Sequence, residues 1–236
     1  MGIEVDSPLS FLTGRISDEL ANFRRRVENR LKLGLSLHSL NYGLRRDLSV
    51  PIEHPVARIP ISVRPMRAED LDLLLPDDPS LPPQERMEAN WRRAFARNVG
   101  TGGYVAIDAR DGSPCYMQWL LRPEQNDFIG RLKIFPLLEQ DEALLENAYT
   151  PPSHRGLGIM SAAMALIAEQ AAGFGARYVM TFVGHDNIAS LKGCRRAGFS
   201  PDMLHVRHDN LFGLIRRNRF ERLPEDDPRR NWETLL

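Results

Sequence analysis

From about residue 61 onward, the spacing of apolar residues predicts helices and strands that follow one another along the chain. Short runs rich in β-branched and aromatic residues are typical of strands, whereas apolar residues at intervals of three and four are typical of helices. Asp111-Gly112 separates two such runs and is a strong hairpin signal. We therefore expect strands over 61–64, 103–109, 114–121, 144–150, 177–183, 203–207 and 211–215, and helices over 67–75, 82–98, 159–171 and 188–197.

Two of these helices carry apolar stripes that predict burial. In the helix over 82–98, Met87, Trp91 and Phe95 share one side, and we expect Trp91 in the core. In the helix over 159–171, the stripe runs from Met160 to Ala171, and Gly173 and Gly175 follow its end. Residues 122–138 show no regular period and are expected to be irregular.

The first 60 residues follow a different pattern. Residues 16–33 predict a basic amphipathic helix, which packs on its own domain or on a second subunit, or alternatively docks on a membrane or a partner. Residues 35–60 contain three prolines and are interpreted as a turn followed by an extended linker. We expect three parts: a helical extension and linker over 1–58, a main domain over 59–223, and a charged, loose tail over 224–236.

Composition excludes several classes of protein. The 236 residues are 42% hydrophobic and 26% charged with a formal net charge of zero, so we expect no nucleic-acid partner. No run approaches the roughly twenty apolar residues of a membrane span, and Glu4 and Asp6 do not fit a secretory signal. We expect a cytoplasmic protein without an integral membrane segment. Cys115 and Cys194 have no metal-ligand spacing, so no metal is expected.

The junction between the strand over 144–150 and the helix that follows it has the character of a phosphate site. The first turn of a helix presents backbone N–H groups without intrahelical partners and attracts anions. Gly156 and Gly158 carry no Cβ and allow a diphosphate to approach the backbone, and Arg155 adds a forked cation. Two glycines before a helix are equally typical of an ordinary tight turn, so this motif alone does not distinguish a phosphate site from such a turn.

A second segment, which lies at a suitable distance along the chain, supports the interpretation of the first as a phosphate site. The strand over 177–183 is followed by Asn187-Ile188-Ala189-Ser190, a short helix, and Gly198-Phe199. With Arg155-Gly156-Leu157-Gly158-Ile159-Met160, this order resembles the GNAT superfamily of acyl-CoA-dependent N-acetyltransferases, from about Ile61 to Phe220. The first motif departs from the family pattern Arg/Gln-x-x-Gly-x-Gly/Ala at Met160, and Cys194 stands where the family usually has tyrosine.

The resemblance implies an α/β (α+β) fold, with a mixed twisted sheet flanked by helices in a single domain. It implies acetyl-CoA as co-substrate and a site that binds it. The residues so implied for acetyl-CoA binding are Tyr149, Thr150, Arg155, Gly156, Leu157, Gly158, Ile159, Met160, Asn187, Ser190 and Cys194.

Acetyl transfer to an amine requires a base, because an alkyl amine is mostly protonated at neutral pH. Glu146 is our candidate, on the strand that in the family separates from its neighbour near the thioester; a salt-bridged carboxylate on a strand is the other interpretation. Simple alternation would place Leu144 and Ala148 on the side of Glu146, unless a bulge inverts it. His154 and His185 are expected to cap or line loops.

Cys194 and Asn187 each have two interpretations. A thiol is a weaker donor than a tyrosine hydroxyl, and we expect Cys194 to pack near Leu191 and Phe199 rather than to act as acid or nucleophile. Asn187 and Ser190 either contact the pantetheine arm, as the resemblance implies, or cap and pack the helix.

The sequence thus predicts an N-acetyltransferase that moves an acetyl group from acetyl-CoA to an amine of an unidentified, small-molecule acceptor by direct attack. Transfer of a different acyl group is one alternative. A non-catalytic acyl-CoA-binding or regulatory module is another, favoured by Met160 and by the missing tyrosine. A homodimer is compatible with both.

Overall fold

A computed structural model describes residues 36–210 and 215–236 of the chain. Contacts divide it into two compact units. Among described residues, the smaller unit holds 36–39, 206–210 and 215–219, and in it the rings of His38 and His208 lie 4.6 Å apart. The larger unit holds 40–205 and 220–236 and contains every residue of the site discussed below. The predicted helix over 16–33 lies outside the described residues.

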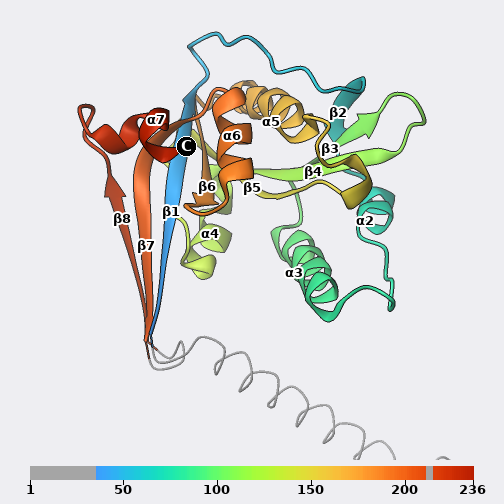
Figure 1. Cartoon of the computed structure of the whole chain (residues 1–236), viewed down its shortest axis with the longest axis horizontal. Helices are drawn as coiled ribbons and strands as arrows, with labels where there is room; N and C mark the ends of the chain where they lie inside the picture. Colours follow the sequence, from blue (N-terminus) through green and yellow to red (C-terminus); the bar gives the residue numbers. More distant parts are fainter. Residues whose placement is uncertain (1–35, 211–214) are drawn as a thin grey trace, which may run out of the picture. The chain divides into compact units, whose positions relative to one another are not determined.

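The described residues form an eight-stranded mixed sheet with the order β2-β3-β4-β5-β6-β1-β7-β8 (Figure 1). Strands β5 and β6 are parallel, whereas β1 and β6, β2 and β3, β3 and β4, and β4 and β5 pair antiparallel. The strands are β1 (Ser36–Asp47), β2 (Ile61–Pro65), β3 (Gly103–Asp108), β4 (Pro114–Leu121), β5 (Glu142–Tyr149), β6 (Tyr178–Gly184), β7 (Ser200–Asn210) and β8 (Ile215–Arg222).

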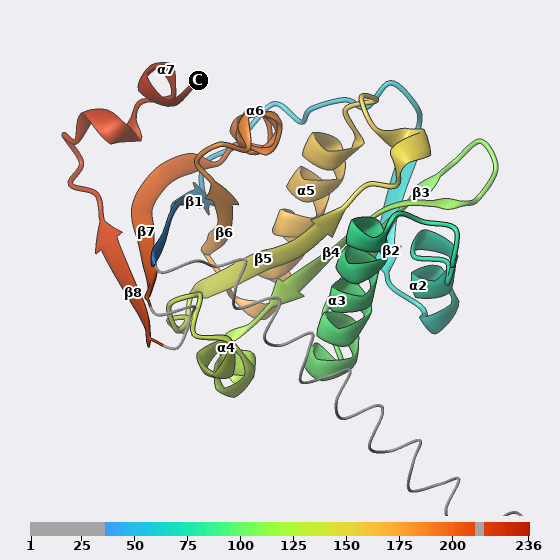
Figure 2. The same cartoon turned by 60° about the horizontal axis from the view of Figure 1, so that its bottom comes forward.

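Helices cover both faces of the sheet in the larger unit (Figure 2). Helices α5 and α6 pack on one face, and α2, α3 and α4 pack on the other. The α-helices are α2 (Ala68–Leu74), α3 (Pro83–Val99), α4 (Asn126–Leu132), α5 (Ile159–Glu169), α6 (Ile188–Arg196) and α7 (Trp232–Leu235). Short 3₁₀ turns are η1 (Pro123–Gln125), η2 (Pro152–His154), η3 (Gln170–Phe174) and η4 (Pro228–Arg230).

Strand β4 shows how one strand contributes to both layers. Tyr116 and Leu120 pack with α5 and α6, whereas Met117 and Trp119 pack with α2, α3 and α4. Successive side chains of a strand point to opposite faces, and here both faces are covered, so all of β4 is buried. This explains why 114–121 is almost continuously apolar rather than alternating.

Most predicted elements from residue 61 onward are confirmed, but the prediction for 35–60 is wrong in its first half. Residues Ser36–Asp47 form β1, which pairs antiparallel with β6, from Asn41 opposite Gly184 to Asp47 opposite Tyr178. Alternating Leu40, Tyr42 and Leu44 supply the strand pattern that the prolines further along obscured. Residues 51–57 form no helix or strand, which is compatible with the expected linker. A domain boundary near Ile59 stays a prediction.

Two other stretches also differ from expectation. The supposedly irregular stretch 122–138 contains η1 and α4, whose Phe128 and Ile129 are buried. The last predicted strand is displaced, because β8 begins at Ile215.

The tail beyond residue 224 is not loose over its described residues. It forms η4 and α7, and the Trp232 indole Nε1 donates to the Phe199 carbonyl over 3.1 Å. Arg230 donates to the Asp202 carboxylate over 3.0 Å.

Candidate functional site

The candidate site lies where β5 and β6 stop pairing. Their parallel ladder runs from Glu142 opposite Tyr178 to Leu145 opposite Thr181. Beyond this point β5 continues to pair with β4, with Glu146 opposite Trp119 and Tyr149 opposite Met117. The gap that opens between β5 and β6 contains a pocket with a volume of about 200 Å³.

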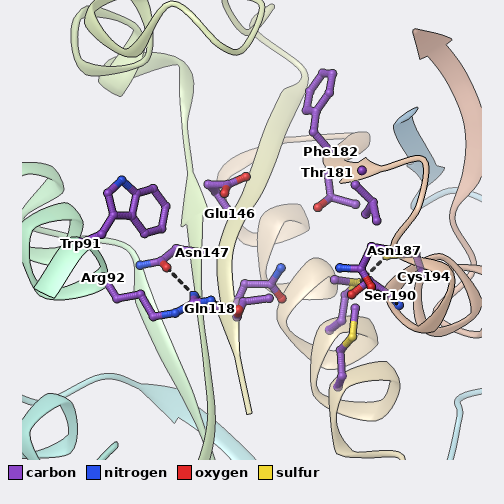
Figure 3. A pocket seen from close by; sticks show the side chains of 15 residues that line it. Trp91, Arg92, Gln118, Glu146, Asn147, Thr181, Phe182, Asn187, Ser190 and Cys194 are labelled. Carbon is purple, nitrogen blue, oxygen red and sulfur yellow. Dashed lines mark hydrogen bonds between the residues drawn. The ribbon is translucent and has the colours of Figure 1, made fainter. Parts of the chain in front are cut away.

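Figure 3 shows that the side chains around this pocket fall into two groups. Trp91 and Arg92 from α3 lie on one side with Asn147, and Asn187, Ser190 and Cys194 from α6 lie on the other, with Glu146 between them. Met160 and Met164 of α5 and Thr181 of β6 also line the pocket. The pocket therefore joins the two helical layers through the opening in the sheet.

A β-bulge at Asn147 shapes this opening. Asn147 has φ of 57°, a left-handed conformation that asparagine tolerates better than most residues. The β4–β5 register shifts at the same place, since three residue steps of β5 face two steps of β4. Glu146, Asn147 and Ala148 consequently all line the pocket, although they are consecutive.

The bulge corrects the alternation expected from sequence. Leu144 packs in the layer of α2, α3 and α4, as does Trp119, the partner of Glu146, so Leu144 and Glu146 do share a face. Ala148, however, packs in the α5 layer, and Tyr149 packs on the side of Leu144. The extra residue at Asn147 inverts the faces beyond it.

Glu146 carries a carboxyl group whose proton affinity is unusual. Burial raises its pKa to about 7, because an ionised carboxylate loses hydration there. The backbone N–H of Asn147 and the positive charge of Arg92 act in the opposite direction and limit the shift. A carboxyl group with this pKa exchanges protons near neutral pH, as a general base must.

The turn before α5 has the backbone geometry of an anion site. Gly156 and Gly158 have φ of 77° and 74°, and Gly158 is the N-cap of α5. Space around Gly156 is open, with no atom within 4 Å of the position of a Cβ, so a ligand could approach it closely. Arg155 is exposed, and its Nε donates to the Thr150 carbonyl over 3.1 Å. The start of α5 fits a diphosphate.

Helix α6 presents polar and sulfur atoms to the same pocket. The Asn187 carboxamide oxygen accepts from the Ser190 backbone N–H over 3.2 Å, which confirms the capping interaction. Cys194 is fully buried, and burial raises its pKa to about 12. Its Sγ lies 3.8 Å from Sδ of Met164. The Met160 sulfur lies 3.1 Å from where Gly193 would carry a Cβ, so α5 and α6 pack closely there.

The structure brings five of the predicted site residues together around the pocket: Glu146, Met160, Asn187, Ser190 and Cys194. The others lie at the end of β5, in the turn leading to α5 and at the first residue of α5; they are Tyr149, Thr150, Arg155, Gly156, Leu157, Gly158 and Ile159. Neither His154 nor His185 lines the pocket. His154 lies 3.7 Å from the Asp108 carboxylate, and His185 contacts the Leu40 carbonyl at 3.1 Å.

Ten of the fifteen residues that line the pocket were not among the predicted site residues, and one of the ten was misplaced. Trp91 is 49% exposed and lines the pocket, so the prediction that it belongs to the core is wrong. Arg92, Gln118 and Asn147 were not selected. Polar residues within otherwise apolar strands could have indicated them. One strand contains a glutamine, and in another an asparagine follows a glutamate, and buried polar side chains of this kind are uncommon unless they are hydrogen-bonded or functional.

Comparison with known proteins shows the family to which this chain belongs. Residues 74–199 match the family model described as the acetyltransferase (GNAT) family, which is more than half of the chain. The chain belongs to this family, whose members use acetyl-CoA as co-substrate. The matched range includes the opening between β5 and β6, the start of α5, and α6. A search of curated proteins found no match.

Solved structures of similar fold include several acetyltransferases. A GNAT-family acetyltransferase from Colwellia psychrerythraea is 14% identical with a TM-score of 0.47, covering 79% of this chain and 57% of that one. A GCN5-related N-acetyltransferase from Sphaerobacter thermophilus is 14% identical with a TM-score of 0.46, covering 76% and 51%. A putative acetyltransferase from Agrobacterium tumefaciens is 26% identical with a TM-score of 0.39, covering 58% and 92%. The chain thus spans little more than half the length of the first two.

The described residues contain neither a membrane-spanning helix nor a metal-binding cluster. None of the described helices combines the length and apolar character needed to cross a membrane. Within residues 36–210 and 215–236, no three histidine, cysteine or acidic side chains are grouped so as to hold a metal ion.

Proposed function

We propose that this protein is an N-acetyltransferase that moves an acetyl group from acetyl-CoA to the amine of a small-molecule acceptor by direct attack. The position of Glu146 carries the proposal. Its carboxyl group, with a pKa raised to about 7, lies in the pocket at the point where β5 and β6 separate. This pocket is also lined by the first turn of α5.

The residues of the α5 and α6 side would bind the donor. The backbone N–H groups of the first turn of α5 and the exposed Arg155 suit the diphosphate, and the open space at Gly156 admits it. Asn187 and Ser190 line the pocket near its α6 wall, where they suit the amide-bearing arm. Tyr149 and Thr150, at the end of β5, lead into this turn.

Glu146 would take a proton from the attacking amine, directly or through one water. The amine nitrogen bonds to the acetyl carbon while the bond from that carbon to sulfur breaks, and the thiolate that leaves must be protonated.

Gln118 is fully buried in the pocket wall, and its Oε1 accepts from the Tyr116 hydroxyl over 2.7 Å. Its Nε2 has no acceptor among the described residues and suits an oxygen that gains negative charge during attack.

Cys194 has no proton-transfer role in this proposal. Its thiol is buried, with a pKa of about 12, and it packs against the Met164 sulfur. We assign the thiolate's proton to solvent or to the acid form of Glu146. The missing tyrosine therefore does not require a non-catalytic role for the protein.

Thiol release from acetyl-CoA in the presence of a panel of amines tests the proposal against the non-catalytic alternative. We expect amine-dependent release of CoA and an N-acetylated product of the added amine by mass spectrometry. Binding of acetyl-CoA without release with any amine would support a binding or regulatory module instead. Release with hydroxyl compounds alone would contradict amine specificity, and a panel of acyl-CoAs would identify a different acyl group.

Three further expectations remain predictions. Cell fractionation tests the cytoplasmic location. Sedimentation measures whether the chain forms a homodimer, and deletion of residues 1–58 followed by lipid or partner capture tests docking by the basic segment.

A further inference from the structure

The α3 side of the pocket contains groups that the proposed acetyl transfer does not use. Figure 3 shows Trp91, Arg92 and Asn147 together on this side, across from the α6 residues that suit the donor. The acceptor has to reach Glu146 from a side that the donor leaves open. The chemistry of these three side chains therefore bears on what the acceptor is.

Asn147 presents a buried hydrogen-bond donor that no described residue accepts. The residue is 4% exposed, and its Oδ1 accepts from Arg92 Nη1 over 2.7 Å, which fixes the orientation of the amide. Its Nδ2 has no acceptor among the described residues, and the residue lines the pocket. A buried amide N–H without a partner is energetically unfavourable, so we expect a ligand oxygen to accept a hydrogen bond from this group.

Arg92 adds positive charge at the same place. Its side chain is 13% exposed and also donates to the Ala148 carbonyl over 3.0 Å, so the bulge holds it against the pocket. The carboxylate paired with it is Glu88, which is 56% exposed and therefore screened by water. Its buried Nε has no acceptor among the described residues. The Asn147 amide and the Arg92 guanidinium thus both favour a ligand oxygen that carries negative charge.

Trp91 provides an apolar surface beside these donors. It is 49% exposed, yet its ring lies 5.8 Å from Phe95, which in turn lies 5.6 Å from Trp119 in an edge arrangement. The tilted contact with the buried Phe95 ring holds the indole on one side, while another part of it stays exposed. Met87, one turn earlier on α3, is 55% exposed and extends the apolar surface.

We propose that the acceptor is an amine bearing a carboxylate and an apolar side chain, which is the chemistry of an apolar α-amino acid. The carboxylate binds Asn147 Nδ2 beside the Arg92 guanidinium, the amino group faces Glu146, and the side chain lies on Trp91. The product is the N-acetyl amino acid, with the amine proton passed to Glu146 and the thiol released. This inference rests on the proposed function for its assignment of the bound amine as the acetyl acceptor.

Matched acceptor pairs test the carboxylate requirement. L-phenylalanine is compared with 2-phenylethylamine, and L-leucine with 3-methylbutylamine, so that each pair differs only in the carboxylate. Binding to the CoA-loaded protein is measured by calorimetry, and kcat/KM by thiol release. We expect at least about a tenfold preference for the amino acid in both measurements, from hydrogen bonds between charged groups. Equal values within each pair, or no binding of either member, would overturn the inference.

Asn147→Asp tests the subsite itself. Aspartate keeps the size of the side chain and tolerates the left-handed backbone, but it replaces the donor with a carboxylate. The preference should fall to about one or reverse, whereas Asn98→Asp on the exposed surface of α3 makes the same change away from the pocket and should retain it. Asn147→Gly, which keeps the backbone conformation without the amide, serves if the aspartate variant does not fold. A full preference in the folded Asp or Gly variant would overturn the inference.

The two readouts separate the inference from the proposed function. Selective binding of amino acids without thiol release from any amine would retain the carboxylate subsite and reject acetyl transfer to the bound amine. Thiol release at equal rates with both members of every pair would retain the acetyltransferase and reject the subsite.

Discussion

Leu145 of β5 and Thr181 of β6 form the last pair before these parallel strands separate, and Glu146 is the next residue along β5. On its other edge β5 stays bound to β4, where Glu146 faces Trp119. The separation therefore opens a pocket without freeing the strand that carries the carboxyl group. The pairing with Trp119 on β4 holds Glu146 in place at the opening.

Replacing Glu146 tests its role as base. We expect Glu146→Gln to lower turnover by about 10²- to 10⁴-fold, the typical contribution of a positioned base. The affinity for CoA should change little, because the amide keeps the shape and the diphosphate site lies at the start of α5. Thiol-release kinetics and calorimetric CoA binding measure the two effects. A large loss of CoA affinity would show that Glu146 supports donor binding instead.

The pH profile gives a second test of the same role. A base acts in its ionised form, so kcat/KM of the wild type should rise with pH through about 7, the pKa of Glu146. The defect of Glu146→Gln should shrink at high pH as the amine loses its proton unaided. Wild-type turnover of the variant from pH 6 to pH 9 would leave Glu146 a structural role. Of the other candidates, Glu142, His154 and an ordered water, the water would then be favoured, because His154 does not line the pocket. Glu142, at the paired end of β5, accepts from the Glu139 backbone N–H over 3.1 Å and does not line the pocket.

The raised pKa of Glu146 also predicts how stability depends on pH. Between the ordinary carboxyl range and about pH 7, the folded protein holds a proton that the unfolded chain has released. Stability from this group is therefore present at low pH and lost as pH rises through about 7. We expect Glu146→Gln to raise the unfolding midpoint relative to wild type more at pH 8 than at pH 5. The exposed Glu124→Gln is the control, and an equal difference at both pH values for Glu146→Gln would contradict the assignment.

Cys194 is expected to be dispensable for the chemistry. With a pKa of about 12 its thiol stays protonated and is a poor nucleophile at neutral pH. Cys194→Ala should retain turnover within about tenfold, less than a positioned acid contributes. Cys115→Ala, which changes the other buried cysteine outside the pocket, controls for packing loss. Turnover lower by orders of magnitude in a folded Cys194→Ala protein, but not in Cys115→Ala, would assign the thiol a chemical role.

Charge reversal at Arg155 tests the diphosphate site. A ligand that binds only the folded state stabilises it, by about 2.7 kcal/mol at a concentration of 100 times Kd. We expect CoA to raise the unfolding midpoint of the wild type and Arg155→Glu to abolish most of this shift. Arg131→Glu makes the same change at an exposed arginine of α4, on the other layer, and should retain the shift. An unchanged shift in Arg155→Glu would move the diphosphate away from this turn.

The sequence predicted the elements around the proposed donor site because local rules determine them. Gly156 and Gly158 take the left-handed backbone that glycine favours, and Asn187 caps α6 with its own side chain. Both motifs depend on residues within one turn of each other. Glu146 was selected from its place on the strand before that turn, and the pocket includes it.

The α3 side of the pocket could not be predicted in the same way, because it depends on contacts distant in sequence. The bulge at Asn147 is held by Arg92, 55 residues earlier, and neither residue alone indicates the other. Trp91 has the helical spacing of a core residue, yet α3 meets the edge of its layer there and leaves 49% of it exposed. The spacing of apolar residues identifies which face of a helix is apolar. It does not show where along the helix the neighbouring layer ends.

The C-terminal segment gives the last prediction, because its attachment contradicts the loose tail expected from its charge. Trp232 is half-buried against the α5 layer, and its Nε1 donates to the Phe199 carbonyl over 3.1 Å. Trp232→Ala should therefore cost about 2 kcal/mol, below the range for a fully buried tryptophan, and lower the unfolding midpoint by roughly 4–8 °C. Trp91→Ala removes the same side chain from an exposed site and should lower the midpoint less. If Trp232→Ala unfolds at the wild-type midpoint, the tail contributes nothing to the fold.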